Sequence, residues 1–314
     1  MKWEDRRRSS NVRRGPSVNN NRGGLGGGPV YRGGFGRSPV RIGGGCGSIF
    51  IILLLLLLSR GLFSFDSGSS YNDNNYNQNQ YEQRQQPTQT SPNRGGAQSE
   101  RERREDFLSV VLADTEDVWH EKFREMGSTY SEPVMVPFTG STRSACGVAS
   151  SDMGPFYCPL DESIYIDAGF YDDLVNRFGG GGDFAFAYVL AHEVGHHVQN
   201  ELGIIDQTNK LRQTLSKKDY NRVSVAQELQ ADYFAGLFAY YIEEKGYLEP
   251  GDIDEAMQAA AAIGDDRIQE MSGRNVNVDT FTHGSSAQRK EAFDLGYKYH
   301  DINHSMKWFD ELGL

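Results

Sequence analysis

The strongest constraint on the fold lies at residues 191–198, where the spacing His192-Glu193-x-x-His196 occurs in a helix-forming segment. Residues four apart on a helix lie on the same face one turn apart, so both imidazoles can face one metal ion. Glu193 falls about 100° around the helix from His192 and can reach a water in an open coordination position. The same pattern also fits a polar helix face whose histidines bind neighbouring side chains. A second feature of the chain must distinguish the two interpretations.

A second helix, predicted around residues 225–236, supplies that feature. Glu228 and Asp232 are four residues apart and therefore share one face of this helix. Glu228 can serve as a third metal ligand, while Asp232 can accept a hydrogen bond from the far nitrogen of a ligating histidine and fix its tautomer. Small residues allow this helix to approach the first one closely, and they are Ala231, Ala235 and Gly236. The two helices together predict a site for one zinc ion, bound by His192, His196 and Glu228.

Two further histidines and one arginine need separate interpretation. His197 is displaced by about 100° from His196 on the helix, so we expect a packed, hydrogen-bonded side chain rather than a ligand. His283 precedes a helix that Ser285 would cap, and it is a candidate donor to a developing oxyanion. Arg289 is the alternative donor, and a loop histidine without a catalytic role is the alternative interpretation of His283.

Charge is distributed unevenly along the chain. Residues 1–60 hold eleven basic and two acidic residues, a net charge of +9, whereas the whole chain carries −11. The part of the chain that folds is therefore strongly acidic, which disfavours nucleic acid as its partner. Arg-Gly segments at residues 22–24 and 32–35 leave RNA binding by the amino-terminal region as a less favoured hypothesis.

An unbroken apolar run at residues 49–58 determines the predicted location of the protein. As a helix it spans only about 15 Å, but the uncharged stretch of residues 42–59 reaches about 27 Å, marginally enough to cross a bilayer. A cleaved signal peptide would need a clear cleavage site, and a buried core helix does not explain the flanking arginines. We therefore predict a single-pass anchor at residues 42–65, with the amino terminus in the cytoplasm and the acidic remainder outside.

Composition sets the remaining domain boundaries. Residues 1–41 are rich in Gly and Arg, and residues 66–105 are rich in Asn and Gln. Neither segment holds enough aliphatic residues to form a core, so we predict a disordered cytoplasmic segment and a disordered tether. The folded domain is predicted at residues 106–314.

Periodicity within that domain predicts mostly helices and a small sheet, which is the α+β class. Helices are predicted at residues 107–127, 184–200, 253–271 and 285–299, and strands at residues 134–138, 154–158 and 163–167. Asp183 is the predicted N-cap of the helix that carries His192. The sheet either binds an extended polypeptide along its edge or only shields the core. Cys146 and Cys158 lie close enough in sequence for a disulfide to be possible, depending on the compartment.

These segments resemble the gluzincin metallopeptidases, in which a Glu-x-x-x-Asp helix follows His-Glu-x-x-His. More narrowly, the chain is similar to the neutral zinc metallopeptidase family of bacterial single-pass membrane proteins. The shared segments are the basic amino terminus with Trp3-Glu4 and its apolar run, Cys146-Gly147, residues 154–159, 192–199 and 228–236, Thr282-His283-Gly284-Ser285 and Gln288-Arg289. The chain departs from the family pattern in its long tether and at Tyr233, where cysteine is expected, and neither departure involves a predicted ligand.

The resemblance implies a zincin-like fold and a membrane-anchored zinc endopeptidase that acts on a protein or peptide. The ligands would be His192, His196 and Glu228. Glu193 would be the general base, His283 would contribute to catalysis, and Asp232 would support a ligand. The alternative function is a zinc-stabilised binding module at the cell envelope that cleaves nothing. Manganese or cobalt could occupy the same ligands in vitro.

Overall fold

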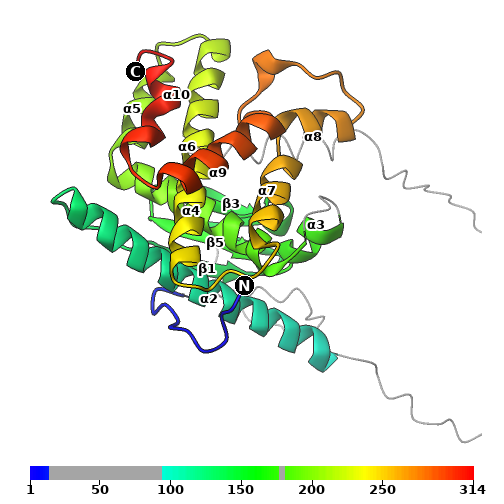
Figure 1. Cartoon of the computed structure of the whole chain (residues 1–314). Helices are drawn as coiled ribbons and strands as arrows, with labels where there is room; N and C mark the ends of the chain where they lie inside the picture. The colour runs from blue at the N-terminus through cyan, green and yellow to red at the C-terminus, as the bar shows by residue number, and fades with distance from the viewer. Residues whose placement is uncertain (14–93, 177–180) are drawn as a thin grey trace, which may run out of the picture.

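Two long helices, α4 (Asp183–Glu201) and α6 (Lys217–Glu244), form the centre of the fold. The structure is a computed structural model that describes residues 1–13, 94–176 and 181–314. α4 is buried along almost its whole length because its first half is a continuous apolar sequence from Phe184 to Ala191. It lies between the sheet on one side and helices α6 and α7 on the other (Figure 1). The metal helix predicted from the sequence is therefore the central element of the core.

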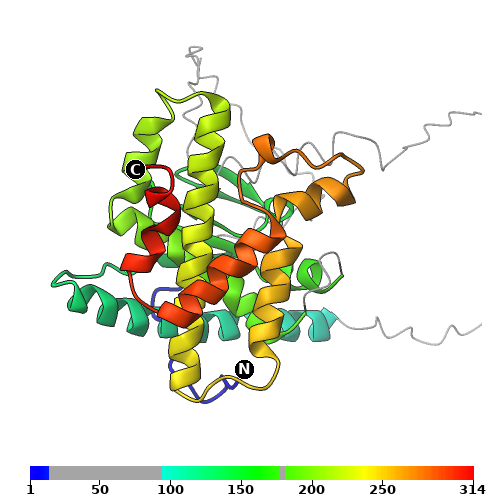
Figure 2. The same cartoon turned by 45° about the horizontal axis from the view of Figure 1, so that its top comes forward.

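The other helices surround this pair, and α9 crosses α6 in both views (Figure 2). They are α2 (Arg94–Glu125), α3 (Phe170–Asn176), α5 (Ile204–Leu211), α7 (Asp252–Ala262), α8 (Asp265–Met271), α9 (Ser286–Tyr299) and α10 (Lys307–Asp310). Short 3-10 helices occupy Ser151–Met153, Val278–Thr280 and Asn303–Met306. The predicted helix at residues 253–271 is divided in two at Gly264, whose backbone is extended with φ −68° and ψ 145°. Glycine fits this position because a Cβ would lie 2.4 Å from the backbone nitrogen of Ser286.

The three strands predicted from the sequence form one small sheet in the order β1-β5-β4. They are β1 (Val134–Phe138), β4 (Phe156–Cys158) and β5 (Ser163–Asp167). β1 pairs with β5 in parallel, and β4 pairs with β5 antiparallel, with Phe156 opposite Tyr165. A separate antiparallel hairpin, β2 (Ser141–Ser144) and β3 (Gly147–Ser150), was not predicted. Its strands are short and mostly polar and show no clear alternation. The α+β class is confirmed.

Gly182, and not the predicted Asp183, is the N-cap of α4. The φ angle of Gly182 is 133°, which favours glycine, and a Cβ there would overlap the carboxylate of Glu255 on α7. The Glu255 carboxylate instead accepts a hydrogen bond from the backbone nitrogen of Phe184 at 3.2 Å. A side chain from another helix therefore caps the metal helix, which local sequence could not indicate.

α2 begins twelve residues earlier than the predicted domain boundary, because residues 94–105 are helical rather than part of a disordered tether. Charged residues at the end of the predicted tether form ion pairs one helical turn apart. Arg101 pairs with Glu105 at 3.1 Å, and Arg104 lies 3.6 Å from Glu100. Arg104 also pairs with Asp172 of α3 at 2.8 Å, which fixes this end of α2 to the domain.

The first thirteen residues also differ from the prediction, because they pack against the domain instead of being disordered. Trp3 is buried, and the backbone nitrogen of Ser9 donates to the carbonyl of Ser109 on α2 at 2.9 Å. Asn11 and Arg13 pair with Met135 on the outer edge of β1. The composition averaged over residues 1–41 did not indicate that a short segment at its start forms contacts with the acidic domain.

The predicted anchor at residues 42–65 lies outside the described residues, as do residues 14–41 and 66–93 of the two segments predicted to be disordered. Among the residues that the structure describes, no helix combines the length and the apolar character needed to cross a membrane.

Candidate metal centre

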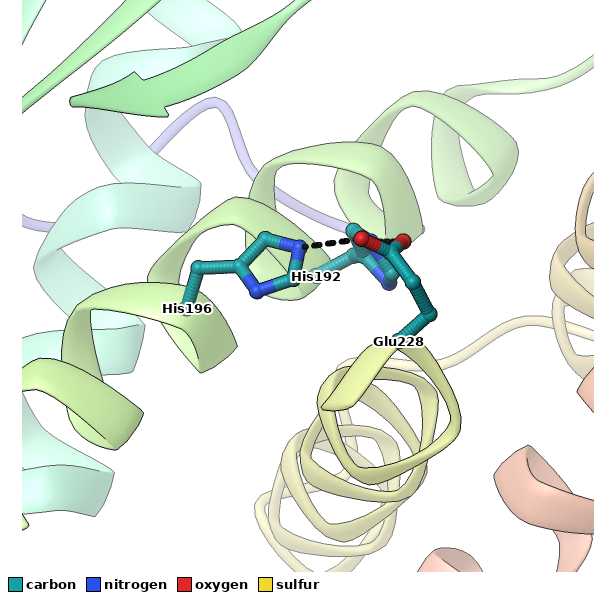
Figure 3. Close-up of side chains that lie close together, drawn as sticks. All are labelled: His192, His196 and Glu228. Carbon is teal, nitrogen blue, oxygen red and sulfur yellow. Dashed lines mark ion pairs between the residues drawn. The ribbon is translucent and has the colours of Figure 1, made fainter. Parts of the chain in front are cut away.

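The three predicted ligands meet in one cluster. His192 and His196 come from α4 and Glu228 from α6, and their ligand atoms all lie within 4.8 Å of one another. His192 Nε2 is 3.4 Å from one Glu228 oxygen, and His196 Nε2 is 3.5 Å from the other. Figure 3 shows both imidazoles and the carboxylate directed toward a common point between the two helices. Two nitrogens and a carboxylate at this spacing can bind one divalent ion.

A close approach of α4 and α6 makes this geometry possible. Gly195, within the His-Glu-x-x-His segment, faces Ala231 of α6, and a Cβ on Gly195 would lie 3.1 Å from the Ala231 backbone. Ala231 therefore allows the close approach of α4 and α6, as predicted. Gly236 does not, because it faces α9, where a Cβ would lie 2.0 Å from the carbonyl oxygen of Phe293.

Asp232 holds His192 in one orientation. One Asp232 oxygen lies 2.8 Å from His192 Nδ1 and also accepts from Tyr188 Oη at 2.5 Å. Because a carboxylate only accepts, His192 Nδ1 carries the hydrogen, and Nε2 presents a lone pair to the cluster. Without a metal, burial favours the neutral imidazole, but the Asp232 carboxylate outweighs it and raises the pKa of His192 to about 9, so a metal ion would displace the proton of Nε2 on binding.

Arg289 makes a buried ion pair with Asp232. Its Nε donates to one Asp232 oxygen at 2.7 Å and its Nη2 to the other at 2.9 Å. Burial opposes the charged forms, yet the Arg289 guanidinium, followed by His192, keeps the pKa of Asp232 below its usual value. Arg289 is thus paired with Asp232, next to a predicted ligand, and its alternative role as oxyanion donor stays a prediction.

His196 is oriented in the same way by Gln199, one turn further along α4. His196 Nδ1 lies 2.8 Å from Gln199 Oε1. The Gln199 amide nitrogen donates to the carbonyl of Gln227 at 2.6 Å and to Gln230 at 3.0 Å, which fixes the oxygen toward His196. Both ligating histidines therefore direct Nε2 at Glu228.

Two atoms of the cluster indicate that a metal ion fits it. His192 Nε2 and one Glu228 oxygen are fully buried and have no hydrogen-bond partner among the described residues. Buried polar atoms are rarely left unpaired, because desolvation without a partner costs roughly 1–3 kcal/mol. A cation between them would satisfy both atoms, and the nitrogen and carboxylate donor set suits zinc.

Glu193 lies beside this cluster and is 4% exposed. Burial raises the pKa of its carboxyl group, while His196 and His192 act in the opposite direction. The backbone of Tyr157 in strand β4, which packs against α4, acts in the same direction as the two histidines and lowers the pKa of Glu193.

His283 is buried near the centre but is not one of the three clustered ligands. Its Nδ1 lies 3.2 Å from Asp265, whose other oxygen accepts from the backbone nitrogens of Thr282, His283 and Gly284. Burial lowers the pKa of His283, but the carboxylates of Glu228 and Asp265 outweigh burial and raise it. The side chain is thus electrostatically coupled to Glu228 and held by a buried acid.

His197 makes hydrogen bonds away from the cluster, as the sequence predicted. Its Nε2 lies 2.7 Å from the carbonyl of Ser131, and its Nδ1 lies 3.0 Å from Tyr157 Oη. Cys146 and Cys158 are joined by a disulfide, which ties the β2–β3 connection to strand β4.

Three side chains that contact the predicted site residues were not predicted from the sequence: Tyr188, Gln199 and Asp265. Helical spacing could have indicated two of them, because Tyr188 lies four residues before His192 and Gln199 three residues after His196. No pattern could have indicated Asp265, which is separated from His283 by eighteen residues and a turn.

A pair of helices that present two histidines, a glutamate and an adjacent buried carboxylate defines the class of site found in metal-dependent hydrolases. The chain belongs to the family described as "Putative neutral zinc metallopeptidase", whose model matches residues 1–307. It is 43% identical over 299 residues to the uncharacterised protein YpfJ of Escherichia coli K12, covering 95% of each chain. It is also 46% identical over 185 residues to the uncharacterised protein Rv2575 of Mycobacterium tuberculosis H37Rv, covering 55% of this chain and 61% of that one. No solved structure matches the chain, so the zincin-like fold stays a prediction.

Proposed function

We propose that the protein is a zinc-dependent metalloendopeptidase that hydrolyses peptide bonds of protein or peptide substrates. The observation that carries this proposal is the convergence of His192, His196 and Glu228, with two buried atoms left without partners, beside the buried carboxylate of Glu193. The family to which the chain belongs supports zinc as the metal.

The proposed roles follow from what each side chain contacts. His192, His196 and Glu228 would hold zinc, which supplies a water of lowered pKa and polarises the substrate carbonyl. Glu193, whose carboxyl pKa is raised by burial, accepts the proton of the attacking water and returns it to the leaving amine. His283, whose pKa is raised by the carboxylates of Glu228 and Asp265, donates to the oxygen that develops negative charge.

Strand β4 is the proposed binding edge for an extended substrate. The described part of the sheet ends at β4 on one side, and on the other side residues 11–13 extend past β1. Strand β4 packs against α4, and the backbone of Tyr157 lies close enough to lower the pKa of Glu193, so a peptide added along this edge would pass the proposed base.

Membrane attachment through residues 42–65, with the domain outside the cytoplasm, is also a proposal. The disulfide between Cys146 and Cys158 supports an oxidising compartment for the domain, because cytosolic thiols are kept reduced. The acidity of the folded part supports the absence of a nucleic-acid partner.

Metal analysis and proteolysis of the purified full chain test the function. Wild type should bind one zinc ion and cleave a denatured protein such as unfolded casein. Glu193→Gln should retain the zinc ion and lose cleavage by at least about 100-fold, because no carboxylate remains to accept the proton. Glu201→Gln, at the other end of α4, is the matched control and should behave as wild type. Zinc binding without cleavage by wild type would instead identify a zinc-stabilised binding module.

A further inference from the structure

The amino-terminal segment, residues 1–13, is integrated into the surface of the folded domain. Trp3 packs edge-on against Phe107 of α2, with ring centroids 5.5 Å apart. The segment ends as a short parallel extension of the sheet, where the backbone nitrogen of Met135 donates to Asn11 and the carbonyl of Met135 accepts from Arg13. Figures 1 and 2 show the segment running beside α2 at the end of the domain where α6 joins α7.

Two buried acids on α2 take their partners from this segment. Asp114 is 6% exposed and pairs with Arg6, and Glu116 is 2% exposed. Glu116 pairs with Arg7 at 2.7 Å and also accepts hydrogen bonds from Ser9 and from Asn11, the latter at 3.1 Å. Leaving a buried carboxylate without its partner is strongly destabilising. This face of α2 is therefore built to be covered by residues 6–11.

Three arginines of the amino-terminal segment are held by the folded domain rather than by a membrane surface. Arginine-rich flanks indicate the cytoplasmic side when their charges are free to interact with the membrane surface. Here Arg6 and Arg7 are paired with acids of the domain, and Arg8 is paired with Asp106 at 2.6 Å. The family model likewise begins at residue 1, so the segment is part of what the family shares.

We propose that residues 1–13 lie on the same side of the membrane as the metal centre. Segments on both sides of the apolar run at residues 49–58 belong to one packed unit, and a chain that crosses a bilayer once would separate them. This topology rests on the membrane attachment proposed above and replaces the expectation that the amino terminus and the domain lie on opposite sides.

Cysteine accessibility in intact cells tests this topology with the full chain. In a Cys46→Ser background, one variant carries Ser10→Cys in the segment and another carries Asn275→Cys in the domain, both at exposed positions. A membrane-impermeant maleimide should label the two positions with the same sidedness. Labelling of one position in intact cells and of the other only after permeabilisation would overturn the proposal.

A second measurement asks whether the segment is docked in the membrane-bound protein. Arg8→Cys and Asp106→Cys, placed where an ion pair now joins the two, should be joined by a short bis-maleimide. After proteolytic cleavage within residues 66–93, the two fragments should stay covalently linked, whereas either single-cysteine variant should release them. Absence of the link would also contradict the proposal. Cleavage of casein is measured separately, so loss of activity and a wrong topology remain distinguishable.

Discussion

At the residue scale, Asp232 connects three buried side chains of the site. It accepts hydrogen bonds from His192 and Tyr188 and forms a two-point ion pair with Arg289. All four side chains are buried, and a polar network of this kind is stabilising only when every member is paired. The orientation of a metal ligand and the packing of α9 are therefore linked through one carboxylate.

Asp265→Asn should shift the pH dependence of cleavage without removing the metal. Activity that depends on protonated His283 is present below the pKa of that imidazole and is lost as the pH rises through it. Because Asp265 helps to raise the pKa of His283, the loss should begin at lower pH in the variant. A pH profile of kcat/KM together with zinc content measures this, and Asp266→Asn on the same helix serves as the control. An unchanged alkaline limb would show that His283 does not act as the proton donor.

Spacing on helices explains which residues could be predicted. His192, His196, Glu228 and Asp232 lie in two short segments, so their grouping follows from helix geometry. The partners of Arg289 and His283 could not be predicted, because Asp232 is 57 residues and Asp265 is 18 residues away in sequence, and only tertiary packing joins them.

At the element scale, glycines determine how closely the helices of the core approach. A Cβ on Gly296 of α9 would lie 1.8 Å from the carbonyl oxygen of Tyr233, and Gly236 of α6 faces α9 in the same way. These contacts involve backbone atoms, which cannot rotate away as a flexible side chain can. The predicted helices were largely confirmed. The faces through which α6 and α9 pack against each other depend on these glycine contacts.

Gly296→Ala should therefore lower the stability of the whole domain by about 3 kcal/mol or more, because α6 and α9 must separate to admit the methyl group. Thermal unfolding monitored by circular dichroism measures the change. Lys290→Ala, at an exposed position of α9, controls for substitution in the same helix and should leave the melting temperature almost unchanged. Equal melting temperatures for the two variants would contradict the close approach.

Helices and strands were predicted wrongly from the sequence where the local composition favours one structure and the tertiary contacts stabilise another. The start of α2 has the composition of a solvated tether, but its charges pair one turn apart and with Asp172. The β2–β3 hairpin is short and polar, so it lacks the alternation by which strands are recognised.

At the scale of the whole molecule, basic residues near the amino terminus lie against acidic residues of the folded domain. Arginines near the amino terminus pair with acids of α2, which brings distant parts of the sequence together. The net charge correctly indicated that the folded domain is acidic. It could not indicate that basic residues near the amino terminus pack against this domain.

A fragment of residues 94–314 should bind a synthetic peptide of residues 1–13. Without the peptide, Glu116 loses its partners Arg7, Ser9 and Asn11, and the fragment should melt at lower temperature. Adding the peptide should restore part of the difference in a concentration-dependent manner. A peptide with Arg6→Glu and Arg7→Glu is the matched control and should not stabilise the fragment. Stabilisation by both peptides would contradict recognition through the buried acids.

The pairing of residues 11–13 with β1 means that the folded unit is discontinuous in sequence. Residues 14–93 separate two parts of this unit along the sequence. The domain can therefore be completed only after the ribosome has made the segment beyond these residues, and the earliest residues must wait for partners synthesised much later. Assembly of the amino terminus is thus a late step in the maturation of this protein.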